Sequence, residues 1–369
     1  MGTAGLWAYP WDIAADGIEA SLDRMAACHI DEVSLAAVYH SGQILSLAGQ
    51  GPHFVSDPVQ PLVDLRDPAG QAILQQFYGP LKDRGLDLRG WTILFHDKPD
   101  WKQVETILGQ TLSHAPCPAA NQARARDLVL SVAESGWFDA LDLESCGYTS
   151  AFHGAHHEIF GVVMTPLLQV LLSICFCAEC QSGMSDVNWD ALRRDVRTGV
   201  GDLVNAASPP TDEEAQLAGF LVENPVVWDY VRGRSAFLSR FLTDLAEQSA
   251  VPIRPILMAQ NFHAQLAWIE GLDPGPESPF DLIALGYGDP SVIAQDLAWL
   301  QSRGWDLGRI TMGQTLVAGR TPDYAAAQGR LQTALEAGVK RITFYNYGLL
   351  NQPRWAWLKR LAAQVAAKV

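Results

Sequence analysis

Short runs of β-branched and aromatic residues recur along the whole chain, and each is followed by a stretch with helical periodicity. Eight such runs begin at Gly5, Asp31, Leu88, Asp139, Pro252, Phe280, Arg309 and Arg341. Four of the intervals between them are close to the roughly 30 residues of a βα unit in a (β/α)₈ barrel. The pattern predicts an α/β fold, a single (β/α)₈ TIM barrel. The alternative is a doubly wound sheet, but no Gly-x-Gly-x-x-Gly follows any run, so we expect no organic cofactor.

The interval between the fourth and fifth runs is much longer than the others and predicts a long helical insertion after the fourth strand. We expect residues 1–369 to form one catalytic barrel domain, with residues 148–251 as the extended connection. That connection would carry a His-rich loop, a Cys cluster and two or three extra helices. Stretches with an apolar face predict helices over Ala14–Ala27, Ala69–Arg84, Ala120–Ser135, Ala236–Ser249, Pro290–Arg303, Pro322–Ala337 and Gln352–Ala367.

Charge and hydropathy exclude two classes of partner. The chain has 26 Lys and Arg against 41 Asp and Glu, a net charge of −15, and no basic stripe that would bind nucleic acid. The longest apolar stretch, residues 160–176, is interrupted by Pro166, Gln169 and Ser173 and is too short to span a membrane. The first strand follows the start without a leader segment, so we expect a cytoplasmic protein, and a homo-oligomer is compatible with the sequence.

Aromatic, imidazole and amide side chains gather where the predicted strands end. Active sites of barrels lie at the carboxyl ends of the strands, and sugar rings need aromatic faces together with hydrogen-bonding groups. A small carbohydrate is therefore the predicted substrate. Alternatively, an aromatic residue at such a position only packs between a helix and the barrel. The candidate substrate-binding residues are Trp7, Tyr9, Trp11, Asp12, Tyr39, His40, His96, Tyr148, His153, His157, Asn261, Tyr287, Gln314 and Tyr345.

Glu144 is the strongest catalytic candidate. Side chains alternate along a strand, so if Leu141 and Leu143 face the helices, Asp142 and Glu144 face the barrel interior. An ionised Asp142 would raise the proton affinity of Glu144, as a general acid requires. In the alternative, Asp142 forms a structural ion pair with an Arg or Lys and Glu144 only binds substrate.

The second catalytic carboxylate has several candidates: Asp12, Asp97, Asp142 and Asp289. Asp142 is nearest to Glu144 along the chain, so the predicted catalytic set is Glu144, Asp142 and Asp289. Alternatively, Asp289 caps the helix that Pro290 begins, and Asp12 caps the helix at Ala14.

Three segments resemble the metal-and-acid region of family-42 β-galactosidases and related (β/α)₈ glycoside hydrolases. They are Cys117-Pro118, the strand ending at Glu144, and Cys175-Phe176-Cys177-Ala178-Glu179-Cys180. In those enzymes the cysteines bind a structural zinc and a Glu ending the fourth strand is the acid/base. The resemblance implies a structural Zn²⁺ on Cys117, Cys175, Cys177 and Cys180, and proton donation by Glu144.

Two positions differ from that family. Leu143 stands where the family has Asn, and Met312-Gly313-Gln314 stands where its nucleophilic Glu ends the seventh strand. Residues 138–144 are also similar to the fourth-strand signature of chitinase-type barrels, but Cys146 occupies the place of their proton-donating Glu. The resemblance thus implies a glycoside hydrolase-like barrel without fixing its family.

The cysteine pattern has its own chemistry. Cys-x-Cys-x-x-Cys with Cys117 offers four soft ligands, enough for a closed tetrahedral zinc site without an open position for catalysis. The alternative is a set of buried thiols or a redox-labile cluster.

The loop after the fourth strand contains His153, His156, His157 and Glu158. Three interpretations stay open: recognition of sugar hydroxyls, a catalytic metal bound by His153, His157 and Glu158, or a solvated surface loop.

These features predict a glycoside hydrolase that cleaves a glycosidic bond of a small oligosaccharide or glycoside, with Glu144 as general acid/base. One alternative is a metal-dependent sugar isomerase or epimerase, which needs a divalent cation on oxygen and imidazole ligands at the barrel mouth. The other is a non-catalytic carbohydrate-binding barrel.

Overall fold

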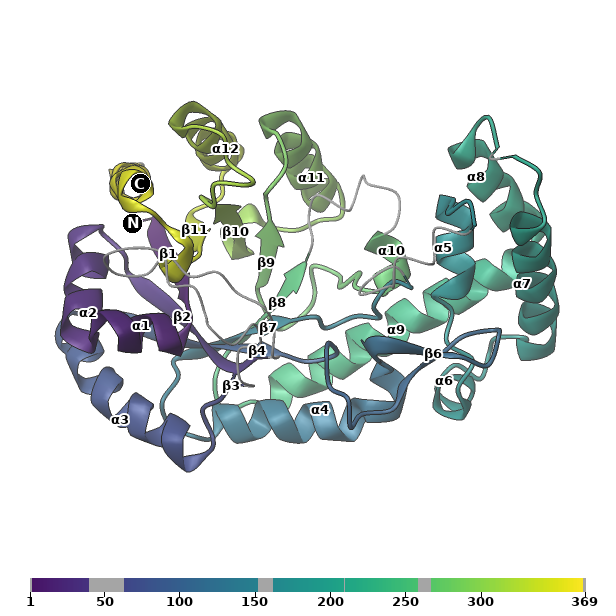
Figure 1. Cartoon of the computed structure of the whole chain (residues 1–369), viewed down its shortest axis with the longest axis horizontal. Coiled ribbons are helices and arrows are strands. Elements are labelled where there is room, and N and C mark those ends of the chain that lie inside the picture. Colours follow the sequence, from purple (N-terminus) through teal and green to yellow (C-terminus); the bar gives the residue numbers. More distant parts are fainter. Residues whose placement is uncertain (1, 40–62, 152–161, 209, 258–266, 368–369) are drawn as a thin grey trace.

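Eight parallel strands close into a barrel in the computed structural model, which describes residues 2–39, 63–151, 162–208, 210–257 and 267–367 (Figure 1). The barrel closes because β1 pairs with both β2 and β11. Each predicted run overlaps one strand, which confirms the (β/α)₈ barrel. The strands are β1 (Thr3–Ala8), β2 (Glu32–Tyr39), β4 (Asp87–Ile93), β7 (Ala140–Glu144), β8 (Ile253–Leu257), β9 (Leu282–Leu285), β10 (Ile310–Thr315) and β11 (Arg341–Tyr345).

Helices return the chain between strands, and several begin earlier than predicted. The helix expected from Ala14 begins at Pro10 and is interrupted at Gly17, whose φ of 85° is left-handed. Proline fits the first helical turn because its fixed φ suits a helix and its missing N–H needs no partner there. The returning helices are α1 (Pro10–Asp16), α2 (Ile18–Ala27), α3 (Pro68–Asp83), α4 (Pro118–Ala133), α9 (Pro225–Gln248), α10 (Ala267–Glu270), α11 (Pro290–Ser302), α12 (Tyr324–Ala337) and α13 (Gln352–Ala367).

The connection between β7 and β8 holds four helices before α9, where the sequence predicts two or three. They gather on one side of the barrel (Figure 1). They are α5 (Pro166–Leu172), α6 (Ala178–Gly183), α7 (Trp189–Val204) and α8 (Glu213–Glu223). The boundaries 148–251 stay a prediction.

Three short strands lie outside the eight. β3 (Val63–Asp64) pairs antiparallel with β2, and β5 (Gln103–Glu105) pairs antiparallel with β6 (Thr111–Pro116). Two 3₁₀ turns, η3 (Leu307–Arg309) and η4 (Tyr347–Leu349), precede β10 and follow β11. No helix in the described part of the chain is long and apolar enough to cross a bilayer.

A charged network fills the lower barrel interior. Arg254 on β8 donates two hydrogen bonds to Asp142 on β7, at 2.8 and 3.0 Å, and a third to Glu32 on β2 at 3.2 Å. Arg89 pairs with Glu32 at 2.6 Å. Asp142, Arg254 and Glu32 are nearly inaccessible to solvent, so these charges compensate one another inside the barrel.

Candidate active site

A cavity of about 300 Å³ lies at the carboxyl ends of the barrel strands, above the charged network. Every barrel strand contributes to its wall, because the last residues of parallel strands converge at one end of the barrel. The described residues that line it are Trp7, Tyr39, Trp91, Glu144, Ile256, Leu285, Tyr287, Thr315, Val317, Arg320, Tyr345 and Leu349. Four predicted substrate-binding residues are in this set: Trp7, Tyr39, Tyr287 and Tyr345.

Aromatic rings packed against one another form one wall. Tyr9 lies behind this wall, where its hydroxyl shares hydrogen bonds with the hydroxyls of Tyr345 at 2.7 Å and Tyr39 at 3.2 Å. Its ring stacks on Trp11 and Trp91, with centroids 4.5 and 5.5 Å apart. Burial raises the pKa of Tyr345 to about 12, so these hydroxyls are neutral at ordinary pH. The wall is rigid and uncharged.

Glu144 ends β7 and faces the cavity, partly exposed. Its Oε2 accepts a 2.6 Å hydrogen bond from the Trp91 indole N–H. Burial raises the pKa of Glu144 to about 7, although this hydrogen bond acts in the opposite direction. A carboxyl group with such a pKa carries a proton at near-neutral pH, so it can donate one.

Asp142 lies one layer lower and takes no part in the cavity wall. Burial alone would raise its pKa, but the charges of Arg254 and Arg89 lower it, and the Ser34 hydroxyl donates a 2.6 Å hydrogen bond. Asp142 therefore forms a structural ion pair with an arginine, which is the alternative that the sequence left open. The predicted reason for the raised pKa of Glu144 needs correction, because burial and not the Asp142 charge is its cause.

The other predicted carboxylates lie elsewhere. Asp289 is exposed at the start of α11, and its side chain makes no capping hydrogen bond. Asp12 is buried inside the first turn of α1 instead of capping a helix at Ala14. A Cβ on Gly348 would lie 1.7 Å from Asp12 Oδ2, so this carboxylate packs directly against the η4 backbone. Asp97 accepts a hydrogen bond from His114 Nδ1 at 2.5 Å.

Six predicted substrate-binding side chains do not line the cavity: Tyr9, Trp11 and Asp12, whose surroundings are given above, and Tyr148, Gln314 and His96. Tyr148 is buried beside the cysteines, with its hydroxyl 3.4 Å from Cys180 Sγ. Gln314 is buried facing the helices, since its neighbour Thr315 lines the cavity and side chains alternate along β10. His96 is half-buried after β4, outside the lining. The predicted residues His40, His153, His157 and Asn261 lie outside the described residues.

The sequence interpretation missed Trp91, Arg254 and Arg320. Trp91 lies two residues before the end of β4, and strand alternation would have placed it inside the barrel. Arg254 is a charge within an otherwise apolar strand, a signal of a buried ion pair. Arg320 lies in the turn after β10 and carries no local pattern that marks it.

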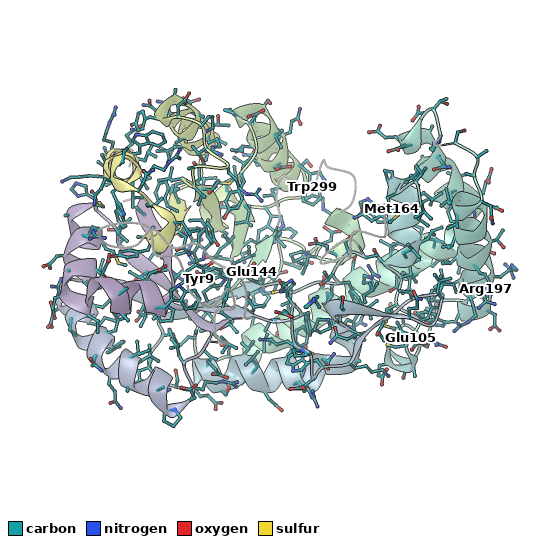
Figure 2. All side chains as sticks on the ribbon, in the orientation of Figure 1. Tyr9, Glu105, Glu144, Met164, Arg197 and Trp299 are labelled. Carbon is teal, nitrogen blue, oxygen red and sulfur yellow. The ribbon has the colours of Figure 1, made fainter. Side chains whose placement is uncertain are left out.

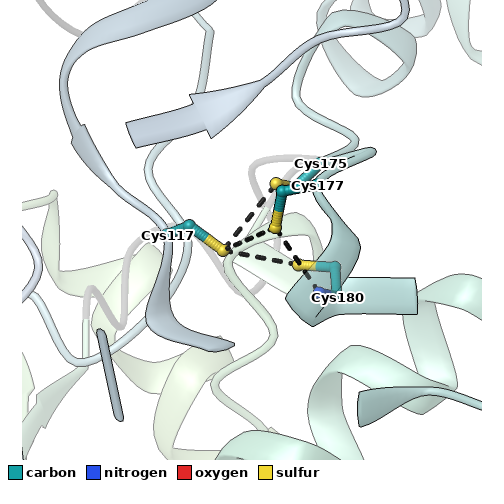
Figure 3. A group of neighbouring side chains, drawn as sticks. All are labelled: Cys117, Cys175, Cys177 and Cys180. Carbon is teal, nitrogen blue, oxygen red and sulfur yellow. Dashed lines mark hydrogen bonds between the residues drawn. The ribbon is translucent and has the colours of Figure 1, made fainter. Parts of the chain in front are cut away.

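The four predicted zinc ligands form one buried cluster (Figure 3). Cys117 Sγ lies 3.4, 3.6 and 3.7 Å from the sulfur atoms of Cys180, Cys177 and Cys175. A tetrahedral zinc with Zn–S bonds of about 2.3 Å separates its sulfur ligands by about 3.8 Å, so the spacing fits this metal. Hydrogen bonding with Cys117 lowers the pKa of Cys177 to about 7. The backbone N–H of Glu105 points at Cys175 Sγ from 3.5 Å, as it would toward a thiolate ligand.

Comparison with solved structures finds the same fold in glycoside hydrolases. The catalytic domain of β-amylase from Paenibacillus polymyxa matches with a TM-score of 0.59 at 11% sequence identity, over 98% of both chains. The PgaB (BpsB) glycoside hydrolase domain from Bordetella bronchiseptica matches at 0.58 and 13% identity, over 98% of this chain and 99% of that one.

A β-galactosidase from Bacillus circulans sp. alkalophilus matches at 0.58 and 12% identity, over 99% of this chain but 56% of its own length. No family model and no curated protein matches the sequence. The chain therefore has a glycoside hydrolase-like (β/α)₈ fold, which confirms the predicted resemblance at the level of the fold.

Proposed function

We propose that the protein hydrolyses a glycosidic bond of a small glycoside or oligosaccharide, with Glu144 as the proton donor. The observation that carries this proposal is a carboxyl group held near neutral pKa inside an aromatic cavity at the catalytic end of the barrel. The matched solved structures, a β-amylase, a glycoside hydrolase domain and a β-galactosidase, support the same class of reaction.

In this mechanism the sugar ring packs on the aromatic wall, and protonated Glu144 donates its proton to the oxygen of the leaving group. The Trp91 indole N–H holds Oε2 and stabilises the carboxylate that remains after transfer. Trp7 adds a buried indole N–H that has no acceptor among the described residues and is available to a sugar oxygen. Glu144 is the only carboxyl group among the described residues of the lining, so the proposal assigns the proton-donating half of the reaction.

The four cysteines are proposed to hold a structural zinc. Four thiolates fill a tetrahedral coordination sphere, so such a metal would cross-link the chain and not activate water. Cys117 precedes α4, and Cys177 and Cys180 lie at the start of and within α6, so the metal would fasten the long insertion to the barrel.

Glu144→Gln tests the proposed proton donor. Activity is screened on nitrophenyl glycosides and then compared between a good and a poor leaving group for the best sugar. Loss of a general acid typically costs about 10²–10⁴-fold in rate, and we expect the larger loss with the poor leaving group, which depends most on protonation. Glu223→Gln, an exposed carboxyl on α8, is the matched control and should retain full activity. Equal activity of Glu144→Gln and the wild type on both substrates would refute the proposal.

A further inference from the structure

We propose that the cavity selects sugars that carry an anionic group, and that Arg320 is the residue that recognises it. The inference deepens the proposed function and rests on it for turnover, whereas the binding preference can be measured without turnover.

Arg320 is the only cationic side chain among the described residues that line the cavity. Its side chain is exposed, and its guanidinium makes no hydrogen bond or ion pair with any described residue. Some surface arginines are paired, such as Arg84 with Glu19 and Asp23, and Arg303 with Asp273. Exposed Arg197 has no ion-pair partner among the described residues either, so what distinguishes Arg320 is its place in the lining of this cavity. In a chain with a net charge of −15, an unpaired guanidinium beside a ligand cavity is available to an anion from solution.

The turn that carries Arg320 is fixed to the end of β10. The Thr321 hydroxyl donates to the Thr315 carbonyl at 2.6 Å, and Arg330 in turn donates to the Thr321 hydroxyl at 2.5 Å. Arg354 donates to the Leu316 and Thr321 carbonyls, at 2.6 and 2.8 Å. Two buried arginines thus hold the turn from both sides, and Arg320 extends from a rigid base. A fixed base lowers the entropy lost when the guanidinium binds a ligand.

Among the described residues, the groups that line the cavity with Arg320 leave its charge uncompensated when Glu144 is protonated. Burial raises the pKa values of the Tyr287, Tyr345 and Tyr39 hydroxyls, so these groups are neutral. The positive charge of Arg320 acts on the pKa of Tyr287 in the opposite direction, because the two side chains lie close together. Burial raises the pKa of Glu144 to about 7, so its carboxyl group is mostly protonated and uncharged below that pH. The unpartnered Trp7 N–H adds another donor. The described lining therefore presents hydrogen-bond donors and one positive charge, which suits a ligand with a negative charge.

The geometry of the guanidinium indicates which anionic groups it can bind. Arginine binds the two oxygens of a carboxylate or phosphate through a planar pair of N–H groups. A volume of about 300 Å³ lies at the lower end of the range for small-molecule sites and has room for a single ring. A sugar with a carboxylate or phosphate substituent fits both features.

The test compares binding of glucuronate, galacturonate and glucose 6-phosphate with binding of glucose and galactose, by calorimetry or ligand-observed NMR. We expect the wild type to bind at least one anionic sugar about tenfold more tightly than its neutral counterpart, which is typical of one charge-assisted contact. Arg320→Gln should lose this preference, Arg320→Lys should retain part of it, and added salt should weaken it. Glucuronate and galacturonate test recognition of a carboxylate, and glucose 6-phosphate tests recognition of a phosphate.

The matched control is Arg197→Gln on α7, an exposed arginine that lies far from Glu144 (Figure 2). It should keep the wild-type preference. Equal binding of neutral and anionic sugars by the wild type, no binding of either, or a preference that survives Arg320→Gln would each overturn the inference.

Turnover separates this inference from the proposed function. A preference that depends on Arg320 in a protein whose Glu144→Gln variant stays fully active would leave anion recognition standing and refute the proton donor. Hydrolysis of neutral glycosides that depends on Glu144, without any anion preference, would refute only the role of Arg320.

Discussion

Two opposing effects set the protonation of Glu144. Burial destabilises the carboxylate, while the hydrogen bond from Trp91 stabilises it. Burial is the larger effect, and the resulting pKa of about 7 lies where proton donation is efficient near neutral pH. The same balance sets the pH dependence of catalysis and the pH dependence of stability, and each can be measured.

Trp91→Phe removes the indole N–H but keeps an aromatic ring in the wall. Because the lost hydrogen bond favours the charged carboxylate, the pKa of Glu144 should rise, by about one unit for a bond of 1.5 kcal/mol. The alkaline limb of the pH dependence of kcat/KM should move to higher pH accordingly. Trp137→Phe, whose N–H bonds to Gln71, is the control and should leave the limb in place. A shift to lower pH would contradict this account.

Glu144→Gln should also alter stability in a pH-dependent way. Folding raises the pKa of Glu144 from 4.5 to about 7. The contribution of this group to stability is therefore greatest below about pH 4.5 and is lost as pH rises through 7. Glutamine carries no such charge. Between pH 5 and 8 the variant should gain stability relative to the wild type, by up to roughly 3 kcal/mol.

Urea denaturation at both pH values measures this gain. Glu223→Gln should show the same difference from the wild type at pH 5 and pH 8. A constant difference for Glu144→Gln would mean that the carboxyl group is not destabilised by burial.

At the level of elements, β7 and β8 are joined by charge as well as by backbone hydrogen bonds. Asp142 and Arg254 are register partners on these two strands, and their ion pair is fully buried. A buried pair adds little compared with well-packed apolar residues, but loss of one partner leaves an uncompensated charge in the core. This network supports the position of the strand that ends in Glu144.

Asp142→Asn should therefore lower the free energy of unfolding by about 3–5 kcal/mol, since Arg254 loses its main counter-charge. The alkaline limb of the pH profile should not move, because burial sets the pKa of Glu144. Urea denaturation and the pH dependence of kcat/KM measure the two effects. The double variant Asp142→Asn/Arg254→Met should recover part of the stability. If the alkaline limb of the pH dependence of kcat/KM moved and stability did not fall, Asp142 would have a catalytic role.

At the scale of the whole molecule, the cysteine cluster connects parts of the chain that are distant in sequence. The segment before α4 meets the segment that carries α6, 58 to 63 residues further along the chain. A bound metal would favour the folded insertion, because metal affinity contributes to folding free energy.

Cys177→Ser should lower the zinc content and reduce stability by at least about 2–3 kcal/mol, a fall in Tm on the order of 5–10 °C. Metal analysis and thermal unfolding measure both changes, and limited proteolysis should cut first between Pro166 and Gln248. Cys28→Ala is the control, because Cys28 is buried at the end of α2 outside the cluster. Full zinc content in Cys177→Ser, or none in the wild type, would refute a structural zinc.

Features that depend on local spacing could be predicted from the order of the residues alone. Alternation along a strand and helical periodicity are properties of neighbouring residues, so the eight strands and the inward direction of Glu144 were predictable. The same alternation would have placed Trp91 inside and Gln314 outside, had it been applied to every strand. The Cys-x-Cys-x-x-Cys spacing likewise predicted a metal cluster, and the family resemblance added Cys117 to it.

Which side chains contact one another became known only from the folded structure. Asp142 forms an ion pair with Arg254, which lies 112 residues further along the chain. Tyr148 contacts the cysteine cluster and does not line the cavity. The pKa of Glu144 and the lack of a counter-charge for Arg320 among the described residues also depend on what packs around these side chains. Burial and counter-charges are set by long-range packing, and local spacing contains no information about either.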